Sequence, residues 1–344
     1  MIRLSGVGSM VDLGLKRWKL QTWLFLKLIP CCTISSRFSA FTRWQLSGWS
    51  TPVVKPAERE GRNVVAAHQS RALWKKLTMN DQGMPRIQKG HGLHRYRPGN
   101  VLDYETNICS WNVRTLRSPG RFEDLKKILQ TYKADITALQ EIRWNGKGEL
   151  EDRTKYQCDL YFSCTPEKRE FGVGFAVRGK ARHCVTRWVP INERLCILRI
   201  KARFYNISLI CAHAPTEDKE DEVKDVFYEQ LEQAYGSLPA YDMKLVLGDF
   251  NAQVGNENIY LGTIGRHSLH TTTNRNGMRL ISFAAARNLV VSSTFFSHPK
   301  IHKQTWTSPD GATKNQIDHV LTEHRHSSSI LDERSRQRKT HASL

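Results

Sequence analysis

The part of the chain that most constrains its fold begins at Asn107, where short apolar runs start to recur between turns. Each run is four to six residues long and rich in Val, Ile, Leu and Cys, which is typical of buried strands. We therefore expect strands at Asn107–Trp111, Ile136–Leu139, Gly172–Val177, Cys196–Ile200, Ile207–Ala212, Lys244–Leu247, Leu289–Ser292 and Ile317–Leu321.

Three stretches between these runs carry apolar residues at helical spacing. The first covers residues 122–129 after a Pro119-Gly120 turn, the second covers residues 223–235 before Gly236, and the third covers residues 280–284. Acidic residues at the start of the second stretch suit the helix dipole, and a glycine suits its end. Many strands with a few helices over about 240 residues predict a layered α/β domain.

The positive charge of the chain is concentrated in its first third. The formal net charge is +19, and residues 1–100 contain 17 of the 52 basic residues but 4 of the 33 acidic ones. We predict a basic, disordered extension at 1–104, a folded domain at 105–334 and a basic tail at 335–344. Because the domain itself is weakly basic, charge alone does not predict a nucleic-acid partner.

Two features bear on the cellular compartment. The eight cysteines include no CxxC pair, and Cys109, Cys196 and Cys211 lie inside strand-like runs. We expect free buried thiols and a reducing compartment, the nucleus or cytoplasm. The first 57 residues are rich in Arg and Ser and contain one acid, so a mitochondrial targeting signal is an alternative. No apolar run of about 18 residues occurs, so no membrane-spanning helix is expected.

Polar residues stand at the ends of several predicted strands. A side chain at a strand end is held in a fixed direction, so several such ends at one sheet edge assemble a polar cluster from distant sequence. These residues are Asn112 after the first run, Glu141 after the second, His213 after Ile207–Ala212, Asp249 and Asn251 after Lys244–Leu247, and Asp318 in the last run.

The residue types in this set favour a divalent cation. Glu141, Asp249 and Asp318 are carboxylates, and Asn112 and Asn251 are amides. Oxygen donors without thiols suit Mg²⁺, with Mn²⁺ as an alternative, and such ions commonly serve phosphate chemistry. Taken singly, each residue is ordinary, because a glutamate at a strand end is usually solvated and Gly-Asp is also a turn sequence. The ordered set carries the argument.

Nine short motifs occur in order over roughly residues 105–334. They are SWNVRTL (110–116), ADITALQEIRW (134–144), GVGFAV (172–177), HAPTEDK (213–219), KLVLGDFNAQVG (244–255), NGMRLISFA (276–284), STFF (293–296), TWTSPDG (305–311) and NQIDHVL (315–321). Together they resemble the endonuclease/exonuclease/phosphatase family with the deoxyribonuclease I-like fold. Within it they are most similar to the apurinic-type endonuclease domains of non-LTR retrotransposons and to craniofacial development protein 2-like sequences.

The resemblance implies a four-layer α/β/β/α sandwich that hydrolyses phosphodiesters in DNA with a bound Mg²⁺. By the same resemblance, Glu141 is the principal metal ligand and Asn112 lies beside the metal and the scissile phosphate. Asp249 is then the residue that orients or deprotonates the attacking water. Asn251 is the residue that hydrogen-bonds the phosphate as its charge develops.

The resemblance places further residues on the substrate side. His213 stands where many relatives have Tyr; either residue can donate to a phosphate or leaving oxygen, and His alone titrates near neutral pH. Thr305 and Trp306 are implied to shape the DNA-facing groove, and Asp318 to orient a catalytic histidine. Arg114, where some relatives have Asp, adds a cation near the phosphate.

The sequence departs from the family pattern after Asp318. The family places its catalytic histidine in a Ser-Asp-His motif followed by a closing strand, and residues 319–344 contain no such motif. His319 adjoins Asp318 in a strand, so its side chain should point to the opposite face and be structural. His341 is expected to be solvated. We therefore expect the sandwich to lack its C-terminal strand and catalysis to be impaired.

These observations predict a Mg²⁺-dependent DNA endonuclease of retroelement origin, with no membrane partner and no small-molecule cofactor. One alternative is a catalytically dead remnant or domesticated domain that binds DNA or protein. Another is a phosphatase for a small phosphate or lipid headgroup, because the same active-site parts serve that chemistry. No oligomeric state is predicted.

Overall fold

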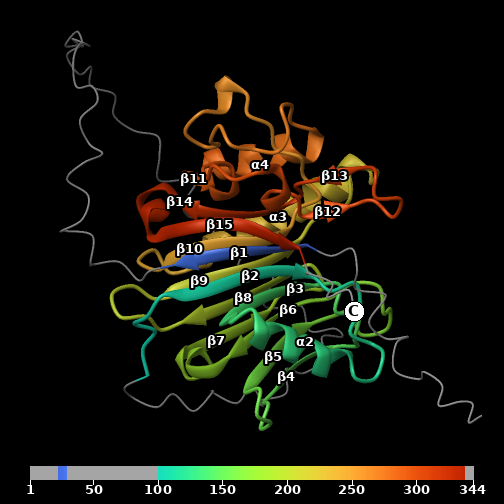
Figure 1. The fold of residues 1–344 in the computed structure, drawn as a ribbon, viewed down its shortest axis with the longest axis vertical. Coiled ribbons are helices and arrows are strands. Elements are labelled where there is room, and N and C mark those ends of the chain that lie inside the picture. Colours follow the sequence, from blue (N-terminus) through green and yellow to red (C-terminus); the bar gives the residue numbers. More distant parts are fainter. Residues whose placement is uncertain (1–21, 29–99, 338–344) are drawn as a thin grey trace, which may run out of the picture. The chain divides into compact units, whose positions relative to one another are not determined.

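The computed structural model describes residues 22–28 and 100–337, most of whose strands form two sheets (Figure 1). The strands of the first sheet are β1 (Thr22–Leu28), β2 (Thr106–Asn112), β3 (Ile136–Gln140), β4 (Lys147–Leu150), β5 (Cys158–Ser163), β6 (Val173–Arg178) and β15 (Ile330–Gln337). Their order across the sheet is β15-β1-β2-β3-β6-β5-β4.

The second sheet is built from later segments of the chain. Its strands are β7 (Val185–Pro190), β8 (Leu195–Ile200), β9 (Ile207–His213), β10 (Met243–Asp249), β11 (Leu289–Val291) and β14 (Asp318–Glu323), in the order β11-β14-β10-β9-β8-β7. A separate hairpin pairs β12 (Trp306–Thr307) with β13 (Lys314–Asn315). In the described part of the chain, β2 pairs with β3 and β9 with β10 in parallel, and the other strand pairs are antiparallel.

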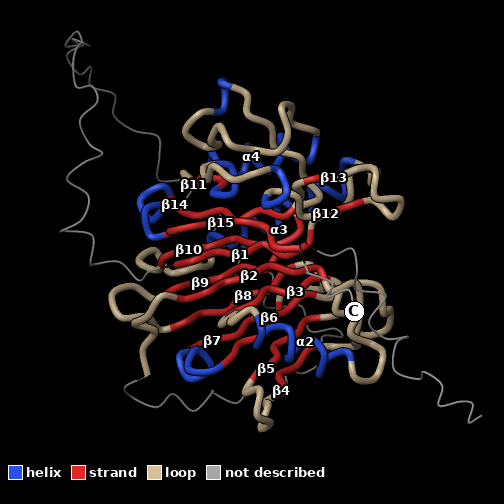
Figure 2. The backbone as a smooth tube through the Cα atoms, viewed as in Figure 1, coloured by secondary structure: helices blue, strands red, loops and turns tan. Residues whose placement is uncertain are grey.

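Helices cover the outer faces of the two sheets (Figure 2). The α-helices are α2 (Arg121–Thr131), α3 (Asp221–Gly236) and α4 (Arg275–Ala286), and the short 3₁₀ helices are η2 (Gly179–Cys184), η3 (Asn258–Tyr260), η4 (Ser292–Thr294), η5 (Lys300–His302) and η6 (His324–Ser329). The three helices expected from helical spacing are thus confirmed. No helix within the described ranges is long and apolar enough to cross a membrane.

Three apolar clusters hold these layers together. The cluster between the sheets joins Ile108 of β2 to Leu209 of β9 and Leu245 of β10. A second cluster packs α3 and α4 on the second sheet, and a third packs α2 on the first sheet through Leu125 and Leu129. Each such aliphatic side chain contributes about 1.5–3 kcal/mol when fully buried. The layers are therefore α2, first sheet, second sheet and α3 with α4, which confirms the four-layer sandwich.

Residues 22–28 and 335–337 differ from the predicted domain boundaries. β1 lies between β2 and β15, so residues 22–28 belong to the domain and are not part of an extension outside it. Within β1, Lys27 is partly exposed and its Nζ lies 2.7 Å from Glu105 Oε1. β15 likewise continues through Gln337 into the predicted tail. The remaining predictions for residues 1–21, 29–99 and 338–344, including His341, lie outside the described residues.

Gly248 allows β10 to lie against β9 just before the sheet edge. A Cβ atom at position 248 would lie 1.9 Å from the carbonyl oxygen of Ala212. We expect Gly248→Ala to lower the free energy of unfolding by about 3 kcal/mol, because the clashing atom is backbone that cannot move aside. Gly236→Ala is the matched control, since nothing lies within 4 Å of a Cβ there. Urea unfolding measures both, and equal midpoints would contradict the close approach.

Glu333 of β15 is a buried carboxyl group that hydrogen-bonds to Ser292. Burial raises the pKa of Glu333 from 4.5 to about 8. The native chain therefore keeps a proton that the unfolded chain releases, and stability falls as the pH rises from 4.5 to 8. We expect Glu333→Gln to be more stable than the parent by on the order of 3 kcal/mol at about pH 7, and by far less at about pH 5.

Urea unfolding at the two pH values measures this difference. The exposed Glu229, replaced by Gln, serves as the control and should show no such pH dependence. A Glu333→Gln effect of the same size at both pH values would contradict the raised pKa.

Candidate active site

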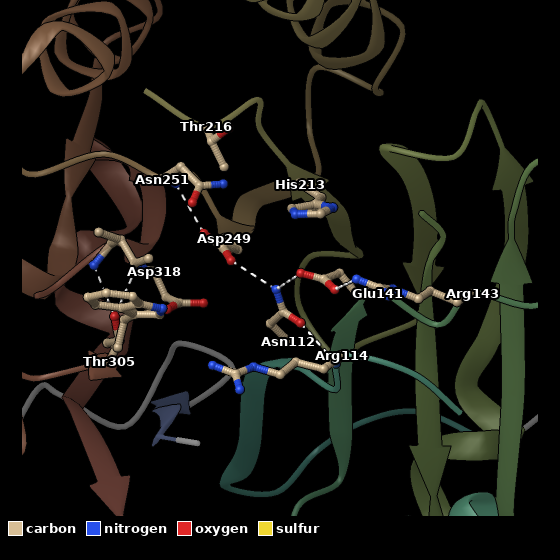
Figure 3. A pocket seen from close by; sticks show the side chains of 12 residues that line it. Asn112, Arg114, Glu141, Arg143, His213, Thr216, Asp249, Asn251, Thr305 and Asp318 are labelled. Atoms are coloured by element: carbon tan, nitrogen blue, oxygen red, sulfur yellow. Dashed lines mark hydrogen bonds and ion pairs between the residues drawn. The ribbon is translucent and has the colours of Figure 1, made fainter. Parts of the chain in front are cut away.

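One cavity of about 450 Å³ opens where strands of both sheets end (Figure 3). Its lining contains all nine residues selected from the sequence, together with Arg143, Thr216 and Ile317. The nine are Asn112, Arg114, Glu141, His213, Asp249, Asn251, Thr305, Trp306 and Asp318. The structure therefore brings the predicted set together, while the role of each residue stays a prediction.

Strand register brings these side chains to the same edge. In the parallel pair β2 and β3, Asn112 lies beside Gln140, so Glu141 follows directly at the strand end. In the parallel pair β9 and β10, Asp249 lies beside His213. On the other side of β10, antiparallel β14 places Asp318 beside Asp249. Residues more than a hundred positions apart in the sequence thus lie close together, because their strands end or begin at the same edge of the sheets.

The Asn112 amide connects the two sheets. Its Nδ2 donates to Glu141 Oε1 at 2.8 Å and to Asp249 Oδ2 at 3.1 Å. Figure 3 shows the three side chains pointing toward one another across the cavity. The Oδ1 of the same amide accepts from the backbone N–H of Arg114 at 3.0 Å, which fixes the amide's orientation. Both carboxylates are thereby held by one side chain.

Arg143 is the main site residue that the sequence reading did not select. Its Nη2 lies 2.5 Å from Glu141 Oε2, so each oxygen of Glu141 has a donor. A cation two residues after the glutamate in QEIRW is a visible signal. However, both residues have left-handed backbone, with φ of 56° and 60°, and alternation along a strand does not predict where such side chains point.

Left-handed backbone at non-glycine residues recurs around the cavity. Besides Glu141 and Arg143, Arg114 has φ of 57° and Asn251 has φ of 48°. Each such residue costs about 1–2 kcal/mol relative to ordinary backbone, and strained positions of this kind concentrate at functional sites. The strain turns the chain sharply at the strand ends, so that consecutive side chains face the cavity.

Burial shapes the protonation of Asp249 and His213, each about 6% exposed. Burial raises the pKa of Asp249, while His213 and hydrogen bonds from Asn112 and Asn251 oppose the increase. The backbone N–H of Asn251 donates to Asp249 Oδ1 at 3.1 Å. Burial lowers the pKa of His213, and the charges of Asp249 and Glu141 oppose that decrease. The pKa of His213 is therefore lower than that of an ordinary histidine, which favours the neutral form of its ring.

Asp318 is a second buried carboxyl group, 7% exposed, beside Asp249. Burial and the charge of Asp249 raise its pKa well above the usual value. Thr305 Oγ1 accepts from the backbone N–H groups of Ile317 and Asp318, which orders this part of the rim. Among the described residues, no cationic side chain forms an ion pair with Asp318.

His319 occupies the structural role predicted for it. Its ring nitrogens lie 2.8 Å from Ser293 Oγ and 2.9 Å from the Ala252 carbonyl oxygen, in a fully buried position. The side chain therefore belongs to the packing between β14 and its neighbours. Of the residues that line the cavity in the described chain, His213 is the one histidine.

The donor set suits a hydrated cation better than a closed metal cage. No group of three or more His, Cys, Asp or Glu residues within the described chain is arranged to hold a metal. Mg²⁺ typically takes one or two carboxylates and completes its shell with water and phosphate oxygens. Glu141 could supply one oxygen once Arg143 gives up its contact, and Asn112 could supply Oδ1 once its amide turns, because Nδ2 is the atom that faces the two carboxylates here.

Comparisons with known proteins identify the family of this chain. Residues 109–333 match the Endonuclease/Exonuclease/phosphatase family. The chain is 32% identical over 229 residues to craniofacial development protein 2 of Bos taurus and, equally, to that of Tragulus javanicus. These matches cover 67% of this chain but 38% and 39% of the relatives, so the chain spans about two fifths of their length.

Solved structures similar to this chain include two endonucleases. The endonuclease domain of TRAS1, a telomere-specific non-LTR retrotransposon, has a TM-score of 0.42 and 15% identity over 63% of this chain and 84% of that one. The AP endonuclease LMAP from Leishmania major has a TM-score of 0.45 and 12% identity over 67% of this chain and 87% of that one. With the family match covering most of the chain, this protein belongs to the endonuclease/exonuclease/phosphatase family.

Proposed function

We propose that this protein is a Mg²⁺-dependent phosphodiester hydrolase of retroelement origin that cleaves DNA. The observation that carries the proposal is the convergence of Glu141, Asn112 and Asp249 in one open cavity, joined by the Asn112 amide. Family membership supports hydrolysis of a phosphate ester as the reaction class. DNA as the substrate rests on the retroelement-like motifs of the sequence.

Glu141 and Asn112 are the residues that would hold Mg²⁺. When bound, the ion would supply positive charge that polarises the phosphate and stabilises its developing negative charge. Arg143, which now contacts Glu141 Oε2, would be available to a phosphate oxygen if it released that carboxylate. Arg114 lines the same cavity and adds a second cation for the DNA backbone.

Asp249 is positioned to act on water. Burial raises its pKa, which makes it a stronger base than an exposed aspartate, and a base is most effective with a pKa near the working pH. The Asn112 amide and the Asn251 backbone N–H fix its two oxygens. Asn251 Nδ2 donates to the Ala214 carbonyl oxygen at 3.0 Å, which keeps its amide at the rim, facing an incoming phosphate.

His213 and Asp318 are the residues that would act on the leaving oxygen. A neutral His213 has one ring N–H that can donate a hydrogen bond to a phosphate or leaving oxygen. Asp318 has no imidazole against it among the described residues, so we propose that protonation of the leaving oxygen is slow and that turnover is impaired. The same observation favours a second candidate, a catalytically dead domain that retains DNA binding.

Nicking of supercoiled plasmid in Mg²⁺ tests the catalytic assignment. We expect Glu141→Gln and Asp249→Asn each to lose at least about 100-fold of the nicking rate, because each removes a group that acts on the transition state. Glu151→Gln is the matched control: it neutralises an exposed carboxylate in a surface pair and should keep the parental rate.

DNA binding measured on the same four proteins distinguishes the two candidates. No nicking above the protein-free background by any of the four, with equal affinity for duplex DNA, would contradict the hydrolase and support the catalytically dead domain. Equal nicking above background by all four would indicate a contaminating nuclease or another mechanism. Hydrolysis of small soluble phosphate esters without plasmid nicking would instead indicate a phosphatase.

A further inference from the structure

β1 is a central strand that comes from a remote part of the sequence. Residues 29–105 separate it from β2, its neighbour in the sheet, and about 300 residues separate it from β15, its neighbour on the other side. Figure 1 shows β1 lying between these two strands. β15 reaches the rest of the first sheet through β1 alone, so β1 determines whether the sheet is continuous.

Backbone pairing along β1 is two-sided. Residues 22–28 pair antiparallel with residues 330–337 of β15, and Leu24 to Leu28 pair antiparallel with Ser110 to Thr106 of β2. Without β1, the facing edges of β2 and β15 would expose unpaired N–H and C=O groups. An extended peptide that pairs with both edges gains main-chain hydrogen bonds on each side, which is the basis of strand-addition recognition.

Side chains of β1 alternate between two different environments. Leu24, Leu26 and Leu28, at 3%, 1% and 0% exposed, face the core between the sheets. Phe25 faces the opposite side, with its ring centroid 5.6 Å from that of Tyr132 and 5.0 Å from the Arg336 guanidinium. A slip of one residue would exchange these two environments, so the alternation fixes the register.

We propose that the space between β2 and β15 is a binding slot for an extended peptide with aliphatic side chains at alternate positions and an aromatic between them. The chain fills this slot with its own residues 22–28, and the same segment supplied as a separate molecule binds in the same register. The elements that line this slot are β2, β15, α2 and the second sheet. All of them come from residues 100–337, so none of them includes residues of β1.

Peptide complementation of the full chain tests this proposal. Leu26→Asp places a charge in the core between the sheets, so we expect it to expel the segment and lower the thermal midpoint by about 10 °C or more. A labelled peptide with the sequence of residues 20–30 should then bind saturably, as seen by fluorescence anisotropy, and raise the midpoint again. The unaltered chain should bind the same peptide at least about 100-fold more weakly, because its slot is filled.

The control peptide carries the same Leu26→Asp change and should neither bind nor restore the midpoint. Hydrogen exchange adds a local measurement: amides of β2 and β15 should lose protection in the Leu26→Asp chain and regain it with the parental peptide. An unchanged midpoint and unchanged exchange in the Leu26→Asp chain would overturn the proposal. Loss of stability that the parental peptide does not reverse would overturn it as well.

Cross-linking provides a second variant if the Leu26→Asp chain aggregates. Phe25 lies opposite Cys109 in the β1–β2 register. Under mild oxidation, Phe25→Cys should form a disulfide with Cys109, whereas Leu24→Cys, which faces the other sheet, should not. A bridge between position 25 and Cys109 supports the register of the segment in the slot, and absence of this bridge overturns it.

Discussion

The Asn112 amide lies between two carboxylates that belong to different sheets, donating to Glu141 on one side and to Asp249 on the other. This contact exists because the inner faces of the sheets are held together by shared aliphatic packing, such as Ile108 against residues of β9 and β10. Close-packed interiors move little, so side-chain packing far from the cavity determines the distance between the two sheets. The chemistry at the edge depends on that spacing.

Much of the site follows from where apolar runs end. The sequence places Asn112, Glu141, His213 and Asp249 at strand ends, and parallel pairing of β2 with β3 and β9 with β10 brings those ends to one level. Asp318 instead lies beside Asp249 in an antiparallel pair, because Asp318 is the first residue of β14. Apolar runs in the sequence indicate such positions, because the buried part of a strand ends at the sheet edge.

Other features depend on information that the local sequence does not contain. The alternation of β1 is readable, but nothing within residues 22–28 identifies β2 and β15 as partners, because strand pairing over such distances is decided by the whole core. β4 and β7 were missed because their burial is partial, so apolar runs are short. Arg143 was missed because its left-handed backbone follows another left-handed residue two positions earlier.

The cavity also concentrates unfavourable electrostatics. Asp249 and Asp318 lie side by side with little exposure, both with raised pKa, and Glu141 stands across from them. Four strained backbone positions surround the same space. The three apolar clusters offset these costs, since each buried aliphatic group is stabilising. A positive charge entering the cavity would relieve the repulsion between these carboxylates, so cation binding and the stability of this edge would be linked.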